Sequence, residues 1–238
     1  CQLFQECGYS IEYKQLNAKD YGVLQNRSRI ILIGKYGHHK NFYPHIPETR
    51  NIYTVEEIFK DLPPIKAGEG SYGLVATLHY DSNYLFDAKI KERDLEPITL
   101  HCARPHTAQD LEIYKKVVQL WSKEKKRLSY TALPKKLQSQ NNLDSFLDRF
   151  KVVASDLPYS QTVVAHIAKD GHYFIHPDIK QNRSLTPREV ARLQTFPDNY
   201  YFESVSGRPS RTTAFRQIGN AVPVLLAEKI ATALLEVW

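Results

Sequence analysis

The sequence of 238 residues contains no methionine, only three cysteines, and no apolar run that we judge long enough to span a membrane. Cys1, Cys7 and Cys102 form no C-x-x-C pair and are too few for a disulfide framework, which favours a reducing, cytoplasmic setting. The N-terminus lacks the basic segment and apolar core of a signal peptide. These absences argue against a secreted or membrane protein, so we expect no membrane partner.

The missing methionine also bears on the extent of the chain. No initiator residue is visible, and the first residues, CQLFQECGY, are typical of the end of a helix rather than the start of a fold. We therefore expect the chain to begin partway through a domain. The alternative is a separate gene product that has lost its first methionine.

Positive charge is in excess, with a net charge of +6 and a pI near 9.1. This balance suits a polyanion such as DNA, although many basic proteins bind no nucleic acid. Apolar residues at helical spacing predict an amphipathic helix over residues 110–126. It leads into a basic stretch that is either a solvated surface or a set of phosphate contacts: Lys123, Lys125, Lys126, Arg127, Lys135 and Lys136.

A helix start is encoded near the C-terminal end of the chain. Thr186 is a good N-cap, Pro187 suits the first helical position, and Glu189 completes a capping box. Phe196 and Pro197 should end this helix. The pattern predicts a short, firmly started helix.

A second helix is predicted at the C-terminus. The pair Gly219-Asn220 predicts a tight turn that leads into it. One face of the helix should be buried because apolar residues recur at helical spacing: Val222, Leu225, Leu226, Ile230, Ala233, Leu234 and Val237.

Together these two segments resemble conserved blocks of the DNA cytosine-5 methyltransferases. Residues 183–197 are similar to the ninth block of that family, R-x-L-T-x-R-E-x-x-R-L-Q-x-F-P, and residues 217–223 to the tenth, Q-x-G-N-x-V-P. The resemblance implies methyl transfer from S-adenosylmethionine to carbon 5 of a cytosine flipped out of double-stranded DNA. It further implies that Gly219, Asn220, Ala221 and Val222 line part of the cofactor pocket, and that residues 186–194 brace the recognition region.

Two strands are predicted within residues 10–35, and Ile30 to Ile33 reads as a strand buried on both faces. Between them, Gln25, Arg27 and Arg29 are spaced by two, so in an extended segment they share one side. That side is either a solvated strand end or a surface for phosphates and base edges.

The same segment is similar to the eighth block of the family, D-Y-G-x-x-Q-x-R-x-R, with Leu24 where the family usually has proline. The resemblance implies that Arg29 is catalytic and binds DNA, because it holds the flipped cytosine and the neighbouring phosphate. Gln25 and Arg27 would support it as further DNA-binding residues.

A β-hairpin is predicted over residues 161–176, with a Lys-Asp-Gly turn. Thr162-Val163 is similar to a Thr-Leu or Thr-Val pair of the family, which implies that Thr162 contacts the DNA backbone. Such a pair is also common strand material. The histidines of this segment, His166 and His176 among them, are interpreted as surface or core residues rather than catalysts.

Three further features receive structural interpretations. Thr54 and Glu57 predict a short capped helix over residues 54–61. The Gly-rich segment 67–73 lacks the lysine of a phosphate-binding loop and is interpreted as a plain loop. His101, Cys102 and His106 lack the paired spacing of zinc ligands, so we expect no metal.

The catalytic motifs of the family are missing. The sequence has no Pro-Cys pair for the thiolate that adds to carbon 6, no Glu-Asn-Val, and no Phe-x-Gly-x-Gly cofactor loop. The chain alone is therefore expected to be inactive. Its expected partners are double-stranded DNA and an N-terminal catalytic half, in the same chain or as a separate subunit.

The resemblance implies an α/β fold: the C-terminal part of a Rossmann-like, S-adenosylmethionine-dependent methyltransferase domain, with an inserted mixed α+β target-recognition domain. Residues 1–35 would end the catalytic domain, residues 36–181 would form the target-recognition region, and residues 182–238 would return to the catalytic domain. A restriction-modification system is the expected setting. The alternative function is a non-catalytic, sequence-specific DNA-binding module derived from such an enzyme.

Overall fold

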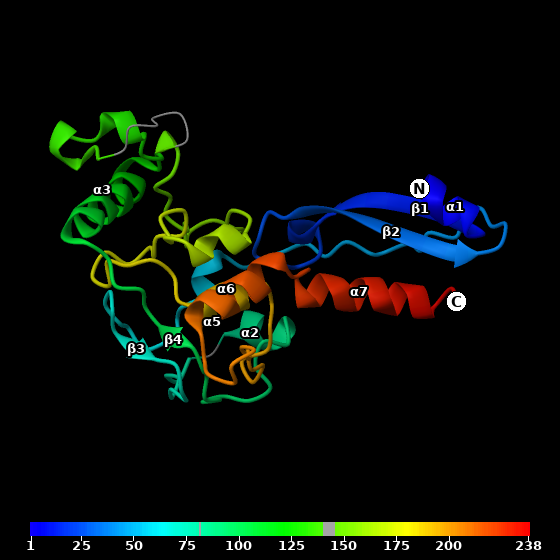
Figure 1. The fold of residues 1–238 in the computed structure, drawn as a ribbon. Helices are drawn as coiled ribbons and strands as arrows, with labels where there is room; N and C mark the ends of the chain where they lie inside the picture. Colours follow the sequence, from blue (N-terminus) through cyan, green and yellow to red (C-terminus); the bar gives the residue numbers. More distant parts are fainter. Residues whose placement is uncertain (81, 140–145) are drawn as a thin grey trace.

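The computed structural model describes residues 1–80, 82–139 and 146–238. Its short helices and strands are joined by long irregular segments (Figure 1). The α-helices are α1 (Gln2–Glu6), α2 (Asn83–Asp87), α3 (Ala108–Glu124), α5 (Pro187–Leu193), α6 (Arg211–Asn220) and α7 (Val224–Leu235). The strands are β1 (Tyr9–Asn17), β2 (Ser28–Tyr36), β3 (Gly70–Ser71) and β4 (His101–Cys102). The 3₁₀ turns are η1 (Ala18–Asp20), η2 (Val55–Ile58), η3 (Tyr130–Ala132), η4 (Lys135–Leu137) and η5 (Ala165–Ala168).

The two predicted N-terminal strands are confirmed as an antiparallel pair that runs from Tyr9↔Tyr36 to Asn17↔Ser28. This hairpin extends away from the centre of the molecule beside α7, and both chain termini lie near its far end (Figure 1). In the described residues β2 pairs only with β1, and β3 only with β4.

The expectation that β2 is buried on both faces is wrong. Ile33 is buried, whereas Ile30 is 67% exposed and Leu32 is 42% exposed. Side chains alternate between the two faces of a strand, and only one face of the hairpin is covered. The covering cluster includes Leu226 and Ala233 of α7.

The C-terminal helices differ from their prediction. Gly219 and Asn220 form the last turn of α6, not a turn that opens the final helix, and α7 begins only at Val224. Within α7 only Leu226 and Ala233 are buried. The predicted apolar face is therefore covered only in part.

One helical stretch of the described residues, Arg211–Leu235, could cross a membrane by length and composition alone. The expectation that no such run exists is wrong on this measure. Ala221 has an extended backbone (φ −69°, ψ 154°), which divides the stretch into α6 and α7. The stretch is weak evidence for a membrane span.

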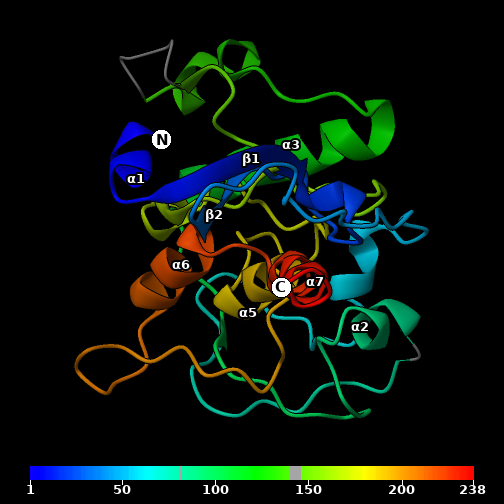
Figure 2. The same cartoon turned by 90° about the vertical axis from the view of Figure 1, so that its right-hand side faces the viewer.

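The central core surrounds α5, which is buried along its whole length and lies near the middle of the molecule (Figure 2). The predicted capping box is confirmed, because Thr186 Oγ1 accepts from Glu189 N and Glu189 Oε2 accepts from Thr186 N. The helix contacts α6, η2 and β4. The core draws on distant parts of the chain: Leu24, Val55, Ile58, Leu85, Val163, Phe174, Leu185, Val190, Phe215 and Ile218.

The predicted amphipathic helix is confirmed as α3, which begins two residues earlier because Thr107 and Asp110 form a capping box. With η3, η4 and Phe150 it encloses a second core at one end of the molecule (Figure 1). Tyr114 is fully buried there.

Two local predictions are wrong. Residues 55–58 form the 3₁₀ turn η2, and the Thr54 side chain makes no capping bond. Residues 161–176 contain η5 and no hairpin. The physical reason lies at Val163, whose amide and carbonyl are bonded by the side chains of Gln25 and Arg27. Neither group is free for a strand ladder.

Candidate functional site

The buried Arg27 joins three segments of the chain. Its guanidinium donates to the carbonyls of Val163, Gly219 (3.0 Å) and Ala221 (2.8 Å). Burial, and next the charge of Arg29, lower the pKa of Arg27 to about 10. Arg27 therefore stays charged at neutral pH and binds three backbone carbonyls at once.

Gln25 links the segment around Arg27 to α5. Its Nε2 donates to Leu193 O and to Gln194 Oε1, both at 3.0 Å, and its Oε1 accepts from Val163 N at 2.8 Å. Gln194 Nε2 in turn donates to Ile218 O at 2.8 Å. We call residues 25, 27, 163, 194, 218, 219 and 221 the polar junction, since their polar groups bond one another.

The polar junction corrects the expected role of the Gln25–Arg27–Arg29 side as a surface. Gln25 and Arg27 are buried, because the long-range contacts turn their side inward. Arg29 is only partly buried, and its Nη1 donates to Ser28 O at 2.6 Å. Of the three, Arg29 alone has a partly solvent-accessible side chain.

Thr162 lies on the outer side of the polar junction. Its Oγ1 donates to Asn26 O at 2.5 Å, and Asn26 N donates to Ser160 O at 2.9 Å. Asn26 is exposed, and both Asn26 and Thr162 line a cavity of about 560 Å³. These bonds fix the backbone at one side of the cavity.

Gly219 allows α6 to touch η5. A Cβ at this position would lie 2.3 Å from Ala165 N and 2.6 Å from Ala165 Cα, closer than real Cβ atoms approach. The next residues face outward: Asn220 and Val222 are exposed and Ala221 is partly buried. The backbone of residues 219–222 is therefore fixed on its buried side, while the Asn220 amide and the apolar Val222 side chain face solvent.

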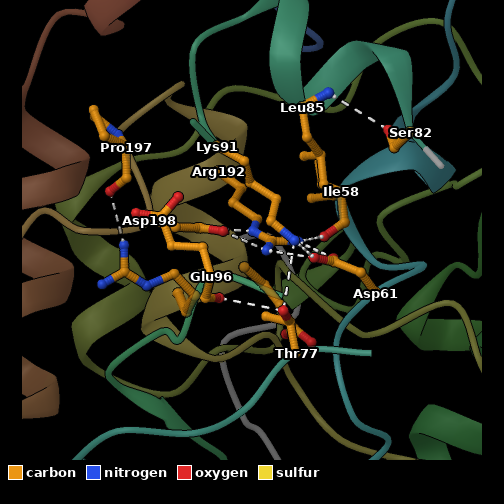
Figure 3. Close-up of polar contacts among 12 residues, drawn as sticks. Ile58, Asp61, Thr77, Ser82, Leu85, Lys91, Glu96, Arg192, Pro197 and Asp198 are labelled. Atoms are coloured by element: carbon orange, nitrogen blue, oxygen red, sulfur yellow. Dashed lines mark hydrogen bonds and ion pairs between the residues drawn. The ribbon is translucent and has the colours of Figure 1, made fainter. Parts of the chain in front are cut away.

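Behind the polar junction, α5 is anchored by a buried ion cluster (Figure 3). Arg192 contacts Asp61 and Asp198, each at 2.5 Å, and Lys91 contacts Asp61 at 2.8 Å. Burial alone would raise the pKa of Asp61, but the charges and hydrogen bonds of Arg192 and Lys91 hold it below its ordinary value. These contacts fit the expected bracing role of this block.

A second buried ion pair supports the start of α5. Arg183 donates to both oxygens of Glu189, at 2.8 and 2.6 Å. Burial opposes ionisation, yet the charge of Arg183 holds the pKa of Glu189 well below its usual range. The fork geometry explains why arginine suits position 183 better than lysine.

The thiols and imidazoles do not form a catalytic cluster. Cys102 is buried, and burial raises its pKa to about 11, so it stays protonated at neutral pH. Cys1 and Cys7 are exposed. Among residues 1–80, 82–139 and 146–238, no group of three His, Cys, Asp or Glu side chains is placed to hold a metal ion.

The sequence reasoning missed the part played by Gln194. It assigned this residue only to the bracing block, whereas its amide links Gln25 to the end of α6. The sequence did contain a signal for this role, because Gln194 is a polar residue directly after the apolar face of a buried helix.

The C-5 cytosine-specific DNA methylase family matches residues 1–236. The chain is 38% identical over 250 residues to the type II methyltransferase M.Bpa9945I of Bacillus paralicheniformis, covering 98% of this chain and 54% of that protein. It is 32% identical over 250 residues to the type II methyltransferase M.DdeI of Desulfomicrobium norvegicum, covering 96% of this chain and 55% of that protein.

The fold is similar to that of a crystallised DNA modification methyltransferase encoded within a prophage (E. coli), with a TM-score of 0.61 and 22% identity over 98% of this chain and 62% of that one. The chain spans about half the length of the curated relatives it matches. The family match over nearly every residue, together with these relatives, shows that the chain belongs to the C-5 cytosine-specific DNA methylase family.

Proposed function

We propose that this chain is the C-terminal half of a type II DNA cytosine-5 methyltransferase that acts in a restriction-modification system. It would supply DNA recognition and one wall of the S-adenosylmethionine pocket. One observation carries the proposal: the polar junction unites the three segments that resemble family blocks, since Arg27, Gln194 and Gly219 all belong to it.

The DNA-facing roles fall to Arg29 and Thr162. Arg29 is partly solvent-accessible, so its guanidinium is available to a phosphate or to a flipped cytosine. Thr162 lies at the cavity beside Asn26. Gln25 and Arg27 have a supporting role, because their buried side chains hold the backbone that carries Arg29 and Thr162.

The family uses S-adenosylmethionine as methyl donor, and the 219–222 turn fits one edge of such a cofactor. Asn220 offers an exposed amide and Val222 an exposed apolar side chain, while Arg27 holds the carbonyls of Gly219 and Ala221 from behind. The cofactor supplies an electrophilic methyl group. Residues 219–222 would orient the cofactor, and none of them donates or removes a proton.

The nucleophile must come from the other half of the enzyme. Cys102 is buried with a raised pKa, and neither Cys7 nor Cys102 follows a proline. Attack on carbon 6 requires a thiolate. This chain alone is therefore proposed to bind DNA without transferring a methyl group, and its partner is the half that carries the thiol.

The proposed division of labour follows the chain. Residues 1–35 and 182–238 would belong to the Rossmann-like catalytic domain, and residues 36–181 would form the inserted recognition region. Residues 81 and 140–145 of that region lie outside the described residues. The proposed setting is the bacterial cytoplasm.

The test is methyl transfer by the enzyme completed with its thiol-bearing half. Arg29→Ala should reduce incorporation of radiolabelled methyl groups into DNA by roughly 100-fold or more, because an electrostatic contact to the reacting base is lost. Thermal unfolding should change little, since within residues 1–80, 82–139 and 146–238 the Arg29 side chain bonds only to the neighbouring Ser28 carbonyl.

Lys35→Ala is the matched control. Lys35 lies in the same strand, and its side chain contacts the ring of Trp238 instead. Turnover of the control should match the unchanged enzyme. Equal turnover of Arg29→Ala would remove Arg29 from the site. DNA binding without any methyl transfer by the completed enzyme would favour a non-catalytic binding module.

A further inference from the structure

The 560 Å³ cavity beside Thr162 has a wall whose chemistry the proposed function does not use. Besides Asn26 and Thr162, this wall includes Arg149, His166 and Asp170, with Arg127 also lining the cavity. Arg149 and its contacts lie within the described residues 146–238. The cavity therefore joins a DNA-facing threonine to a group of titratable side chains.

Arg149 is held in one orientation. Its Nη2 donates to Asp170 Oδ2, and its Nη1 lies 3.4 Å from His166 Nδ1. The ion pair is partly enclosed, with side-chain exposures of 18% and 28%. A guanidinium has five N–H donors, so several remain for a ligand after Asp170 takes one. The buried Nε of Arg149 has no partner among the described atoms.

Asp170 is itself fixed by the backbone. Its Oδ1 accepts from His172 N at 3.0 Å. Burial raises and Arg149 lowers the pKa of Asp170, and the balance lies below its ordinary value. Asp170 stays ionised at neutral pH and clamps Arg149 against the cavity wall.

Arg127 marks the outer rim of the cavity. It is exposed, and its guanidinium lies 5.5 Å from the ring centre of Trp121 at the end of α3. Stacking on an indole restricts an arginine without neutralising it. Arg127 thus pairs with no carboxylate among the described residues and is suited to bind a phosphate, while Arg149 offers oriented N–H donors.

We propose that this cavity is a base-reading site in which Arg149, clamped by Asp170, donates to the acceptor edge of a guanine while Arg127 holds an adjacent phosphate. In the major groove guanine offers two acceptors, O6 and N7, which match an arginine fork, whereas adenine has an amino donor beside N7 and cytosine presents an amino donor. This inference rests on the proposed DNA-binding function, and names the residues that decide which sequence is bound.

The experiment is selection from a duplex library with a randomised centre, by the purified protein and by each variant. Arg149→Gln should lose the preference for guanine at one position, by roughly tenfold or more. Asp170→Asn keeps the arginine but removes its ionic clamp, and should weaken the same preference without abolishing it. Arg127→Gln should lower the affinity for all sequences alike and reduce the salt dependence of binding.

Arg93→Gln is the matched control. It makes the same change of charge at an exposed arginine that lines a different cavity, of about 210 Å³, beside Asn199. Its selected sequence and affinity should equal those of the unchanged protein. Circular dichroism of each variant checks the fold, and the Asp170→Asn arm keeps the proposal testable if Arg149→Gln fails to fold.

The two proposals fail in different ways. If the unchanged protein selects no sequence and binds no duplex, the DNA-recognition function itself is wrong. If it selects a sequence that Arg149→Gln and Asp170→Asn select equally well, DNA recognition stands and the cavity is not the base-reading site. Replacement of the preferred guanine by 7-deazaguanine, which lacks N7, should reproduce the Arg149→Gln loss; an unchanged affinity would overturn the proposed contact.

Discussion

Replacing Gly219 with alanine should push α6 away from η5 and open the polar junction. The added Cβ would lie 2.3 Å from Ala165 N, and the nearby obstacles are backbone atoms that cannot rotate away. Ordinary van der Waals contact requires a movement of about 1 Å. A shift of this size would stretch the bonds from Arg27 to Gly219 O and Ala221 O.

The magnitude follows from three contributions. Overpacking costs about 1–3 kcal/mol, and the loss of charged hydrogen bonds from Arg27 costs about 1.5–3 kcal/mol more. The higher helix propensity of alanine offsets about 1 kcal/mol of this loss in the free energy of unfolding. The free energy of unfolding should therefore fall by roughly 2–5 kcal/mol, which lowers Tm by about 5–15 °C for a chain of this size.

The assay is thermal unfolding followed by circular dichroism, with Gly73→Ala as the matched control. A Cβ at Gly73 would meet only Ser71 Oγ, at 3.6 Å, so this variant should unfold near the unchanged Tm. Methyl transfer by the completed enzyme should also fall for Gly219→Ala. A Tm within about 1 °C of the Gly73→Ala value would refute the close approach of α6 to η5.

Two further predictions concern the buried charges. Arg192→Ala should lower the free energy of unfolding by about 3–5 kcal/mol, because buried Asp198 loses its paired arginine and buried Asp61 keeps only Lys91. Chemical denaturation should show this loss. Lys89→Ala at the exposed pair with Glu228 should cost less than about 1 kcal/mol, and equal losses for the two variants would contradict the argument. Burial, and next the charge of Arg183, lower the pKa of His176 from 6.5 to about 3, so between these values the unfolded chain binds a proton that the folded chain does not, and stability must fall as the pH falls. The loss of stability from His176 should reach about 2 kcal/mol at about pH 5. His106 adds a loss of the same sign, because burial lowers its pKa to about 4. His176→Gln should therefore reduce the slope of the unfolding free energy against pH between about 6.5 and 5, and an unchanged slope would show that His176 does not contribute to it.

The sequence by itself determined the elements whose causes are local. The capping box of Thr186 and Glu189 formed as predicted, because the bonds join residues three apart. The α3 helix and the β1–β2 pair also followed from apolar periodicity. Membership of the methylase family could also be predicted from the sequence, because whole blocks of the sequence resemble those of the family.

Tertiary structure decided which side of residues 25–29 is buried. The spacing of Gln25, Arg27 and Arg29 specifies a shared side, but a period of two cannot say whether that side meets solvent or protein. The groups that bury Gln25 and Arg27 are Val163 and the end of α6, more than 130 residues away along the chain. No local pattern contains that information.

The same distinction explains two further errors. Residues 161–176 carry a strand-like pattern, yet Gln25 and Arg27 bond both backbone groups of Val163 and leave no ladder there. Gly219 reads as a turn residue in the sequence, whereas in the fold it is the point where α6 touches Ala165. Local sequence determined the conformations available to these segments, and long-range hydrogen bonding and packing selected among them because they satisfy backbone groups that the core buries.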